Sequence, residues 1–240
     1  MDNKIVSSII ISIAVVASAF LLSGVLKDFN KSKQTINVTG SAKRDIVSDL
    51  GKLTLSVSVN AASQLEGMKE INRQKPQLLE FLKKKGIAEN KIKLRPVNSY
   101  PNYAIGENGY QTGRITSYSV SQEVYIESEK VNLIEAISLE AAALLEQGLN
   151  INIFQPEYYY TQLAPLKIQI QAEAAADAKD RATKIAEATG RKIGPLTSAR
   201  MGVLQITPEN SNNISDYGMN DVSSIKKEIT AVVNATFLVD

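Results

Sequence analysis

Hydrophobic and polar residues alternate regularly in two parts of this chain. The stretch Lys52–Asn60 (KLTLSVSVN) has an aliphatic residue at every second position, and Ile229–Val239 (ITAVVNATFLV) has an apolar residue at every second position. A period of two residues is typical of a β-strand that buries one face. The sequence therefore predicts strands over both stretches, each with one side against a core.

Five further segments have the apolar, β-branched and aromatic character of strands. They are Thr35–Gly40, Ile92–Tyr100, Ile115–Glu127, Asn150–Leu163 and Leu196–Ile206. Two polar segments lie between strands: Pro101–Gly113, which is rich in Gly, Asn and Tyr, and Thr207–Ser224. Both are predicted to be loops.

A first helix is predicted from Ser63 to Lys85. Ser63 and Glu66 have the spacing of a capping box, in which both side chains satisfy free N–H groups at the helix start. Gly86 is suited to end the helix. Pro76 removes an internal hydrogen bond, so the helix is expected to bend or divide there. The predicted core stripe is Met68, Ile71, Leu78, Leu79 and Leu82.

Two more helices are predicted, at Val131–Gln147 and Pro165–Thr189. The first has apolar residues at helical spacing and is followed by Gly148. The second has an alanine-rich face, which should let it lie close against a sheet. Its opposite face carries acid-to-base pairs four residues apart, a spacing that supports an exposed helix surface. The pairs are Asp177–Arg181, Asp180–Lys184 and Glu187–Arg191.

Strand pairs that alternate with single helices indicate the fold class. The predicted order is strand-strand-helix-strand-strand-helix-strand-helix-strand-strand, which does not fit a doubly wound parallel sheet. We expect an α+β fold with mixed, largely antiparallel sheets packed by about three helices. One N-terminal transmembrane helix is expected to precede it.

The transmembrane prediction rests on an uncharged run of 22 residues, Ile5–Leu26. A bilayer core of about 30 Å requires roughly 20 apolar residues as helix, whereas the apolar region of a signal peptide has about 7–15. We therefore expect an n-region at residues 1–4 and a signal anchor at residues 5–26. A polar tether at residues 27–34 would then lead to a folded domain at residues 35–240.

A cleaved signal peptide is the alternative interpretation. Ala17-Ser18-Ala19 fits the small-x-small pattern of a cleavage site, and cleavage after Ala19 would release the domain. The residues alone leave the orientation of an anchor open. Lys27, Lys31 and Lys33 follow the run, and cations tend to stay on the cytoplasmic side.

Composition excludes several kinds of chemistry. The chain has no His and no Cys, so it cannot form a Ser-His-Asp or Cys-His nucleophilic system, a Cys or His zinc site, an Fe–S cluster or a disulfide. Its 27 basic and 25 acidic residues are interspersed, and no basic face for nucleic acid results. Gly106, Gly109 and Gly113 lack the pattern of a phosphate loop. We expect no cofactor, no metal and no nucleic acid partner.

Carboxylates are the catalytic groups that remain. Asp45 and Asp49 flank a connection between predicted strands, and Asp216 and Asp221 lie in the polar loop near the C-terminus. Two acids that share a cleft can act as acid and base. Acids in turns more commonly cap the backbone or face solvent, so no catalytic residue is assigned.

Tyrosines mark a candidate contact surface. Tyr100, Tyr103 and Tyr110 gather in the first predicted loop, and Tyr118 follows. Tyrosine is enriched at protein interfaces because it buries a large area and keeps a polar end. Packing within the fold is the alternative for these residues, and it is the favoured interpretation for Tyr158–Tyr160.

Several motifs agree with one known family. They are VTGSAKRDIVSD at residues 38–49, KKKGIAENKIKL at 83–94, YPNY at 100–103, RITSYSVSQEVYI at 114–126 and AAADAKDRATKIAEATGRKIG at 174–194. Together they resemble the SIMPL-domain family, which includes bacterial periplasmic and outer-membrane-associated immunogens. Asp177-Ala178, Arg181-Ala182, Ala186, Gly190 and Gly194 fill the family's helix pattern. Ser48 stands where a proline is common in the family.

The resemblance implies an α+β domain on the outer side of the cytoplasmic membrane, with residues 1–4 on the cytoplasmic side. It carries no established catalytic residue. It also implies oligomeric assembly in some members and a loose link to stress tolerance. We therefore expect a non-enzymatic protein of the inner membrane, with its domain in the periplasm, that self-associates or binds an unknown envelope protein. The alternatives are a carboxylate-dependent hydrolase of an envelope polymer and a small-ligand-binding domain with its cleft under Thr207–Ser224.

Overall fold

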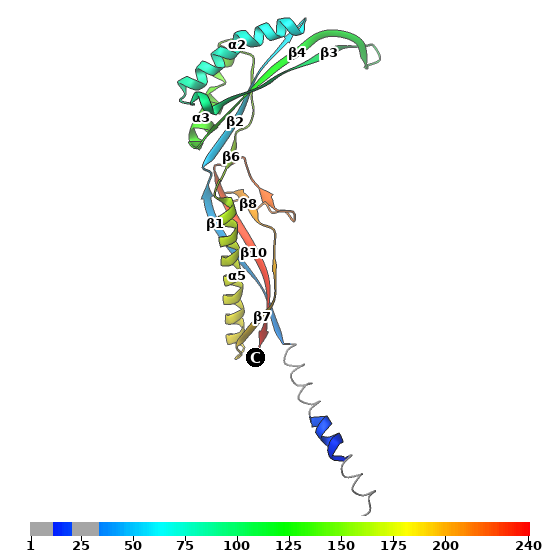
Figure 1. Cartoon of the computed structure of the whole chain (residues 1–240), viewed down its shortest axis with the longest axis vertical. Helices are drawn as coiled ribbons and strands as arrows, with labels where there is room; N and C mark the ends of the chain where they lie inside the picture. The colour runs from blue at the N-terminus through cyan, green and yellow to red at the C-terminus, as the bar shows by residue number, and fades with distance from the viewer. Residues whose placement is uncertain (1–11, 21–33) are drawn as a thin grey trace, which may run out of the picture.

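Two mostly antiparallel sheets, each of five strands, form two lobes that lie end to end (Figure 1). The computed structural model describes residues 12–20 and 34–240. In each lobe helices cover one face of the sheet. The expected α+β fold is confirmed, with four helices in the two lobes. We name the lobes after their principal helices, the α5 lobe and the α2 lobe.

The α5 lobe is built on a long central strand at the end of the chain. This strand pairs with β1 along one edge and with β7 and β8 along the other, and β9 adds to β8 in parallel. The elements are β1 (Thr35–Val47), α5 (Leu163–Ala188), β7 (Ile193–Met201), β8 (Gln205–Pro208), β9 (Met219–Asn220) and the central β10 (Lys226–Val239).

Alternation in β10 is confirmed in full. Every second residue from Ile229 to Val239 is buried, and those from Ile229 to Phe237 form one cluster with the alanine face of α5. The helix residues in this cluster are Leu166, Ile170, Ala174, Ala178 and Ala182. The period-two strand and the small-residue helix therefore make the core that the sequence predicts.

Helix α5 and strand β1 approach each other closely at one glycine. A Cβ atom at Gly40 would collide with Ala174 O and Ala178 N and would lie 2.7 Å from Ala178 Cα. Next to it, Asp177 Oδ2 accepts a hydrogen bond of 2.8 Å from Ser41 N and one of 2.7 Å from Arg181 Nε. These two bonds lower the pKa of Asp177. The aspartate thus covers a backbone N–H of β1.

The α2 lobe contains the other sheet, in the order β3-β4-β2-β5, with β6 also paired to β2. Its elements are β2 (Leu50–Ala61), α2 (Gln64–Lys84), a 3₁₀ turn (Glu89–Lys91), β3 (Ile92–Ile105), β4 (Gln111–Ser128), α3 (Val131–Glu140), α4 (Ala143–Glu146), β5 (Ile151–Ile153) and β6 (Glu157–Tyr159). Both α2 and α3 pack on the sheet, and the core is larger than that of the α5 lobe.

Helix α2 begins as expected and buries Ile71, Leu78 and Leu82 of the predicted stripe, with Leu79 partly buried. Ser63 Oγ accepts from Glu66 N at 3.2 Å, and the helix continues through Pro76 as a single element. Met68 is 39% exposed, so its assignment to the core is wrong. The buried positions are Gly67, Ile71, Gln74, Leu78 and Leu82. Gln74 is tolerated because it donates to Glu70 and accepts from Asn150 N, which satisfies a polar group away from water.

Four predicted segments differ from the structure in their boundaries. The predicted loop Pro101–Gly113 is mostly strand, and its turn is limited to residues 106–110. The predicted helix Val131–Gln147 is divided into α3 and α4 after Glu140. The predicted strands Asn150–Leu163 and Leu196–Ile206 are each two shorter strands.

Residues 12–20 of the predicted anchor are helical. The rest of the predicted span at residues 5–26, together with residues 1–4 and the tether up to residue 33, lies outside the described residues. Within residues 12–20 and 34–240, no helix is both long and apolar enough to span a membrane.

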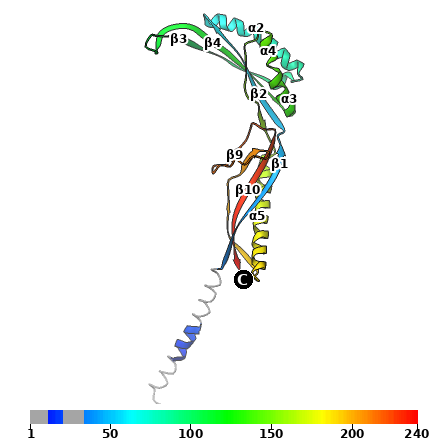
Figure 2. The ribbon, with the colours of Figure 1, turned by 180° about the vertical axis from the view of Figure 1, so that it is seen from behind.

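The helices lie on one side of both sheets. Figures 1 and 2 show α2 and α3 outside the upper sheet and α5 on the corresponding side of the lower sheet. The free faces of the sheets share the opposite side, where the β3–β4 hairpin projects past the lobe as a curved arm. The two long sides of the molecule therefore differ, because one is formed by helices and the other by free sheet faces.

The close approach of α5 to β1 predicts a stability effect. Gly40→Ala should lower the free energy of unfolding by about 3 kcal/mol, because overpacking against fixed backbone atoms is costly. Gly113→Ala is the matched control, since no atom lies within 4 Å of its added Cβ and its change should stay within about 0.5 kcal/mol. Urea denaturation of the detergent-solubilised chain measures both. Equal stability of the two variants would contradict the packing described here.

Candidate functional site

The β3–β4 arm carries the three tyrosines that the sequence singles out. Tyr100 and Tyr103 lie on β3, and Tyr110 lies at the turn and is 74% exposed. Tyr100 is paired with Ser119, whereas Tyr103 is paired with Ile115. Side chains alternate along a strand, so Tyr100 and Tyr103 face opposite sides of the arm. The three residues share the arm but do not form one patch.

One face of the arm is apolar. Cross-strand partners share a face, and the pairs Pro101–Tyr118 and Tyr103–Ile115 therefore lie on the same side of the ribbon. This side continues the sheet face on which α2 packs. The contact with α2 is tight near Val120, because a Cβ at Gly67 would collide with its side chain.

Helix α2 does not cover this apolar strip, because the strip lies beyond the first turn of the helix. The helix begins at Gln64 and meets β4 at Val120, and Tyr118 is still partly buried against the core. Beyond that point Tyr103, Ile105 and Ile115 are exposed. A two-stranded ribbon with an uncovered apolar face is marginally stable alone in water.

The four candidate catalytic acids are not gathered in one cleft. Asp45 is exposed on β1, where its register partner is Glu228. Asp49 lies between the lobes and accepts from Thr161 N at 2.8 Å and Thr161 Oγ1 at 2.7 Å. Within residues 12–20 and 34–240, no three acids are placed to hold a metal ion. The turn role of Asp49 matches the capping interpretation of such acids.

Asp221 and Lys227 form a buried polar cluster at the junction of the lobes. Lys227 Nζ donates to Tyr158 O and to Asp221 O, both at 2.6 Å. Burial lowers the pKa of Lys227, and the charge of Asp221 opposes this shift. Burial raises the pKa of Asp221, but the hydrogen bonds from Ser223, the nearby Ser224 side chain and the charge of Lys227 together lower the pKa by more than burial raises it. The pair joins three segments of the chain.

Backbone hydrogen bonds complete this junction. Ser48 N donates to Ile225 O at 2.8 Å, and Tyr158 N donates to Val222 O at 2.7 Å. Ser48 is buried. A proline at this position has no N–H and could not make the first bond, so the serine of this chain permits a backbone hydrogen bond to the residue before β10.

A cavity of about 610 Å³ lies under the polar loop, where the sequence places a cleft. Its floor is the free face of the α5-lobe sheet, with the Lys43–Glu228 ion pair at 2.8 Å. Gln205 holds the loop by donating to Ser215 O at 2.6 Å. Asp216 lines the cavity, apart from the junction acids. Its size is in the range of small-molecule sites, but its polar groups do not converge on one ligand chemistry.

A scan of protein families matches residues 36–237 to the model SIMPL, described as a protein of unknown function (DUF541). The chain belongs to the SIMPL family. The resemblance inferred from the motifs is confirmed, and the helix pattern of residues 174–194 has a structural explanation in the packing of α5 on β1. The matched range ends two residues before the last residue of β10 and includes both lobes.

Three curated proteins illustrate the relationship. The uncharacterized protein YggE of Edwardsiella ictaluri is 22% identical over 71% of this chain and 69% of its own length. YggE of Escherichia coli K12 is 25% identical over 72% of this chain and 68% of its length. The 26 kDa periplasmic immunogenic protein of Brucella melitensis is 26% identical over 66% of this chain and 63% of its length.

The Lys227 cluster predicts a specific loss of stability. Lys227→Met should leave two buried carbonyl groups without their donor and lower the free energy of unfolding by about 1–3 kcal/mol. Lys226→Met is the matched control, because Lys226 is exposed on the neighbouring position of β10 and its change should stay within about 0.5 kcal/mol. Urea denaturation measures the difference. A Lys227→Met variant as stable as its control would show that this cluster does not hold the lobes.

Proposed function

We propose that this SIMPL-family protein is a non-enzymatic envelope protein that works by protein–protein contact through the β3–β4 arm. The observation that carries the proposal is the exposed apolar face of the arm. This face continues a buried sheet face past the N-terminal end of α2. Burial of such a face against a partner is favourable, and aromatic residues are enriched in interface cores. A second copy of the chain or another envelope protein supplies the partner surface.

We also propose that the two lobes lie on the outer side of the cytoplasmic membrane, tethered through residues 5–26. The uncharged run is long enough to span a bilayer as helix, and a relative is named periplasmic. Cleavage after Ala19 is the alternative and would release the domain into the periplasm. The intact mass of the protein from its native membrane distinguishes the two.

Contact through the arm predicts a change in assembly. The double variant Tyr103→Ser/Ile115→Ser should weaken the association by about 2 kcal/mol or more, as loss of a buried aromatic anchor commonly does. Light scattering in detergent should show a mass above the 26.1 kDa of one chain for the parent protein, or a co-purified envelope partner. The variant should return to the monomer mass without that partner.

Tyr217→Ser is the matched control for the arm variant. Tyr217 is 97% exposed in the α5 lobe, far from the arm, and its loss should leave assembly unchanged. A parent protein that is strictly monomeric and carries no envelope partner would contradict the proposal. A double variant that assembles like the parent would contradict the role of the arm.

The hydrolase alternative has its own test. Asp45→Asn and Asp216→Asn should each restore the envelope phenotype of a deletion strain, because Asp45 does not line the cavity and Glu228, the other acid beside Asp216 there, is paired with Lys43. Asp49→Asn and Asp221→Asn should do the same provided that thermal unfolding shows a folded domain, since both acids accept structural hydrogen bonds. A folded variant that fails to complement would identify a catalytic carboxylate and overturn the non-enzymatic proposal.

A further inference from the structure

An apolar groove of about 450 Å³ runs along the α5 lobe between α5 and the edge strand β7. Its origin is geometric. A helix about 10 Å wide covers about two strands spaced 4.8 Å apart, and here α5 lies on β1 and β10. The sheet at this level has a third strand, β7, on the far side of β10. The face of β7 next to α5 is therefore left uncovered.

The uncovered face is apolar by its register with β10. Ile193, Leu196 and Ala199 are paired with residues of β10 that point toward α5, and they share that face. Leu196 is 52% exposed. The opposite wall is formed by Ala175 and the stem of Lys179 on α5. A lysine stem can line an apolar groove while its ammonium group stays at the rim.

The groove opens at the end of the molecule where the N-terminal segment attaches. Gln34, the residue before β1, accepts from Val239 N at 3.0 Å and from the guanidinium of Arg191. Figure 1 shows the start of β1, the end of α5, β7 and the C-terminus together at this end. Residues 27–34 separate this point from the uncharged run and span at most about 29 Å.

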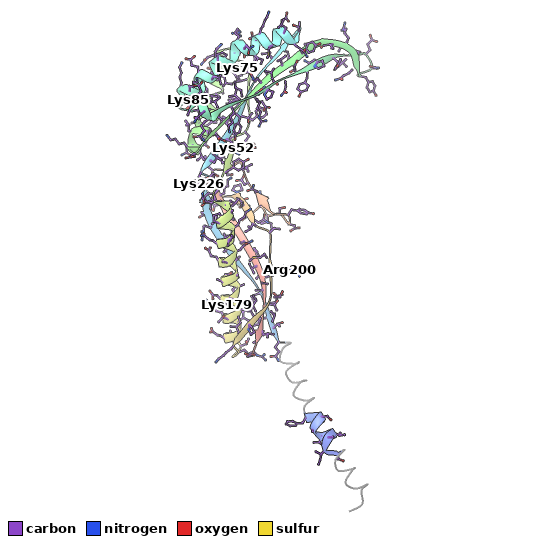
Figure 3. The ribbon with its side chains drawn as sticks, viewed as in Figure 1. Lys52, Lys75, Lys85, Lys179, Arg200 and Lys226 are labelled. Atoms are coloured by element: carbon purple, nitrogen blue, oxygen red, sulfur yellow. The ribbon has the colours of Figure 1, made fainter. Side chains whose placement is uncertain are left out.

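Charge at this end favours an anionic partner. Arg191 and Lys192 follow α5 at this end, and Lys179 lines the groove. Figure 3 shows Lys179 on α5, beside the groove, whereas Arg200 follows Ala199 on β7 and lies on the opposite face of the sheet. Asp240 lies opposite Lys192 in the backbone pairing and offsets part of this charge. The side chain of Lys192 forms no ion pair within residues 34–240 and is exposed.

We propose that the groove binds an acyl chain of an anionic phospholipid from the membrane that holds the protein, with Lys192 near the lipid phosphate. The inference rests on the proposed function in one respect, because it requires the anchor at residues 5–26 to keep this end of the molecule at the bilayer. An apolar groove beside cations fits a lipid, whose chain is apolar and whose head group is negative. Lipid contact would fix the α5 lobe against the membrane surface.

The chain lacks cysteine, which permits a clean labelling test. Leu196→Cys carries a nitroxide in the full-length protein in nanodiscs that contain phosphatidylglycerol. Collision with oxygen should be high and collision with a water-soluble nickel chelate low, as in lipid. Ile168→Cys is the matched control, because Ile168 is 71% exposed on the other end of α5 and should show the opposite accessibility.

A second variant tests the charge. Lys192→Glu in the labelled protein should lower the lipid-contacting fraction about fivefold in phosphatidylglycerol nanodiscs. It should have little effect in phosphatidylcholine nanodiscs. Lys69→Glu is the matched control, because it makes the same charge change at an exposed position of α2. It should leave the lipid-contacting fraction unchanged in both kinds of nanodisc. Thermal unfolding confirms that each labelled variant is folded.

Two results would overturn the inference. A Leu196 label as water-accessible as the Ile168 label in phosphatidylglycerol nanodiscs would exclude lipid in the groove. Dipolar broadening between labels on two copies would show that a second copy occupies it instead. Cleavage after Ala19 in the native membrane would contradict the proposed anchor. It would not change the accessibility of the Leu196 label in the reconstituted full-length chain. Assembly through the arm is measured separately by light scattering, so its failure is distinguishable from failure of lipid binding in the groove.

Discussion

The contact between α5 and β1 at Gly40 is the constraint on which the α5 lobe depends. Backbone touches backbone there, because Gly40 has no side chain and Ala174 and Ala178 have small ones. Asp177 then reaches Ser41 N and covers an edge N–H that would otherwise be free. Close packing of this kind is intolerant of added volume. It fixes where the helix lies across the sheet, and every other surface of the lobe follows from that position.

The position of α5 explains both the filled core and the open groove. Over β1 and β10 the helix is close enough for small alanines to bury the alternating side chains of β10. The same closeness keeps α5 from extending over β7. A bulkier helix face would lie further from the sheet and spread across a third strand. The apolar character of Ile193, Leu196 and Ala199 thus belongs to a sheet face that its own helix cannot cover.

Much of the fold can be read from the sequence, and what cannot depends on contacts between distant segments. The alternation of β10 and the alanine face of α5 are local periodicities, so they are visible in one sequence. Gln74 is a core residue because Asn150 N, 76 positions away, donates to it. No local pattern contains that information. From helical spacing alone, a stripe that contains Met68 fits as well as one that contains Gly67 and Gln74.

The tyrosine arm was missed for a related reason. The residues from Pro101 to Gly113 have turn-forming composition, and their strand character comes from pairing with β4 across the hairpin. A loop has no alternation, so the sequence placed Tyr100 and Tyr103 together. In a ribbon, the same spacing of three residues separates them to opposite faces. The pairing of Tyr103 with Ile115 could have been found by testing the two segments as a hairpin.

The placement of the two uncovered apolar surfaces restricts how the protein can assemble. The groove lies at the end where the chain enters the α5 lobe, and the arm lies in the α2 lobe at the opposite end (Figure 1). An anchor at residues 5–26 would hold all copies in one membrane with the same orientation. Any rotation axis relating contacting copies must then run along the membrane normal. Arms of neighbouring copies would meet at the same height, away from the bilayer, and the one-sided arrangement of helices would leave both free sheet faces directed to the same side of each copy.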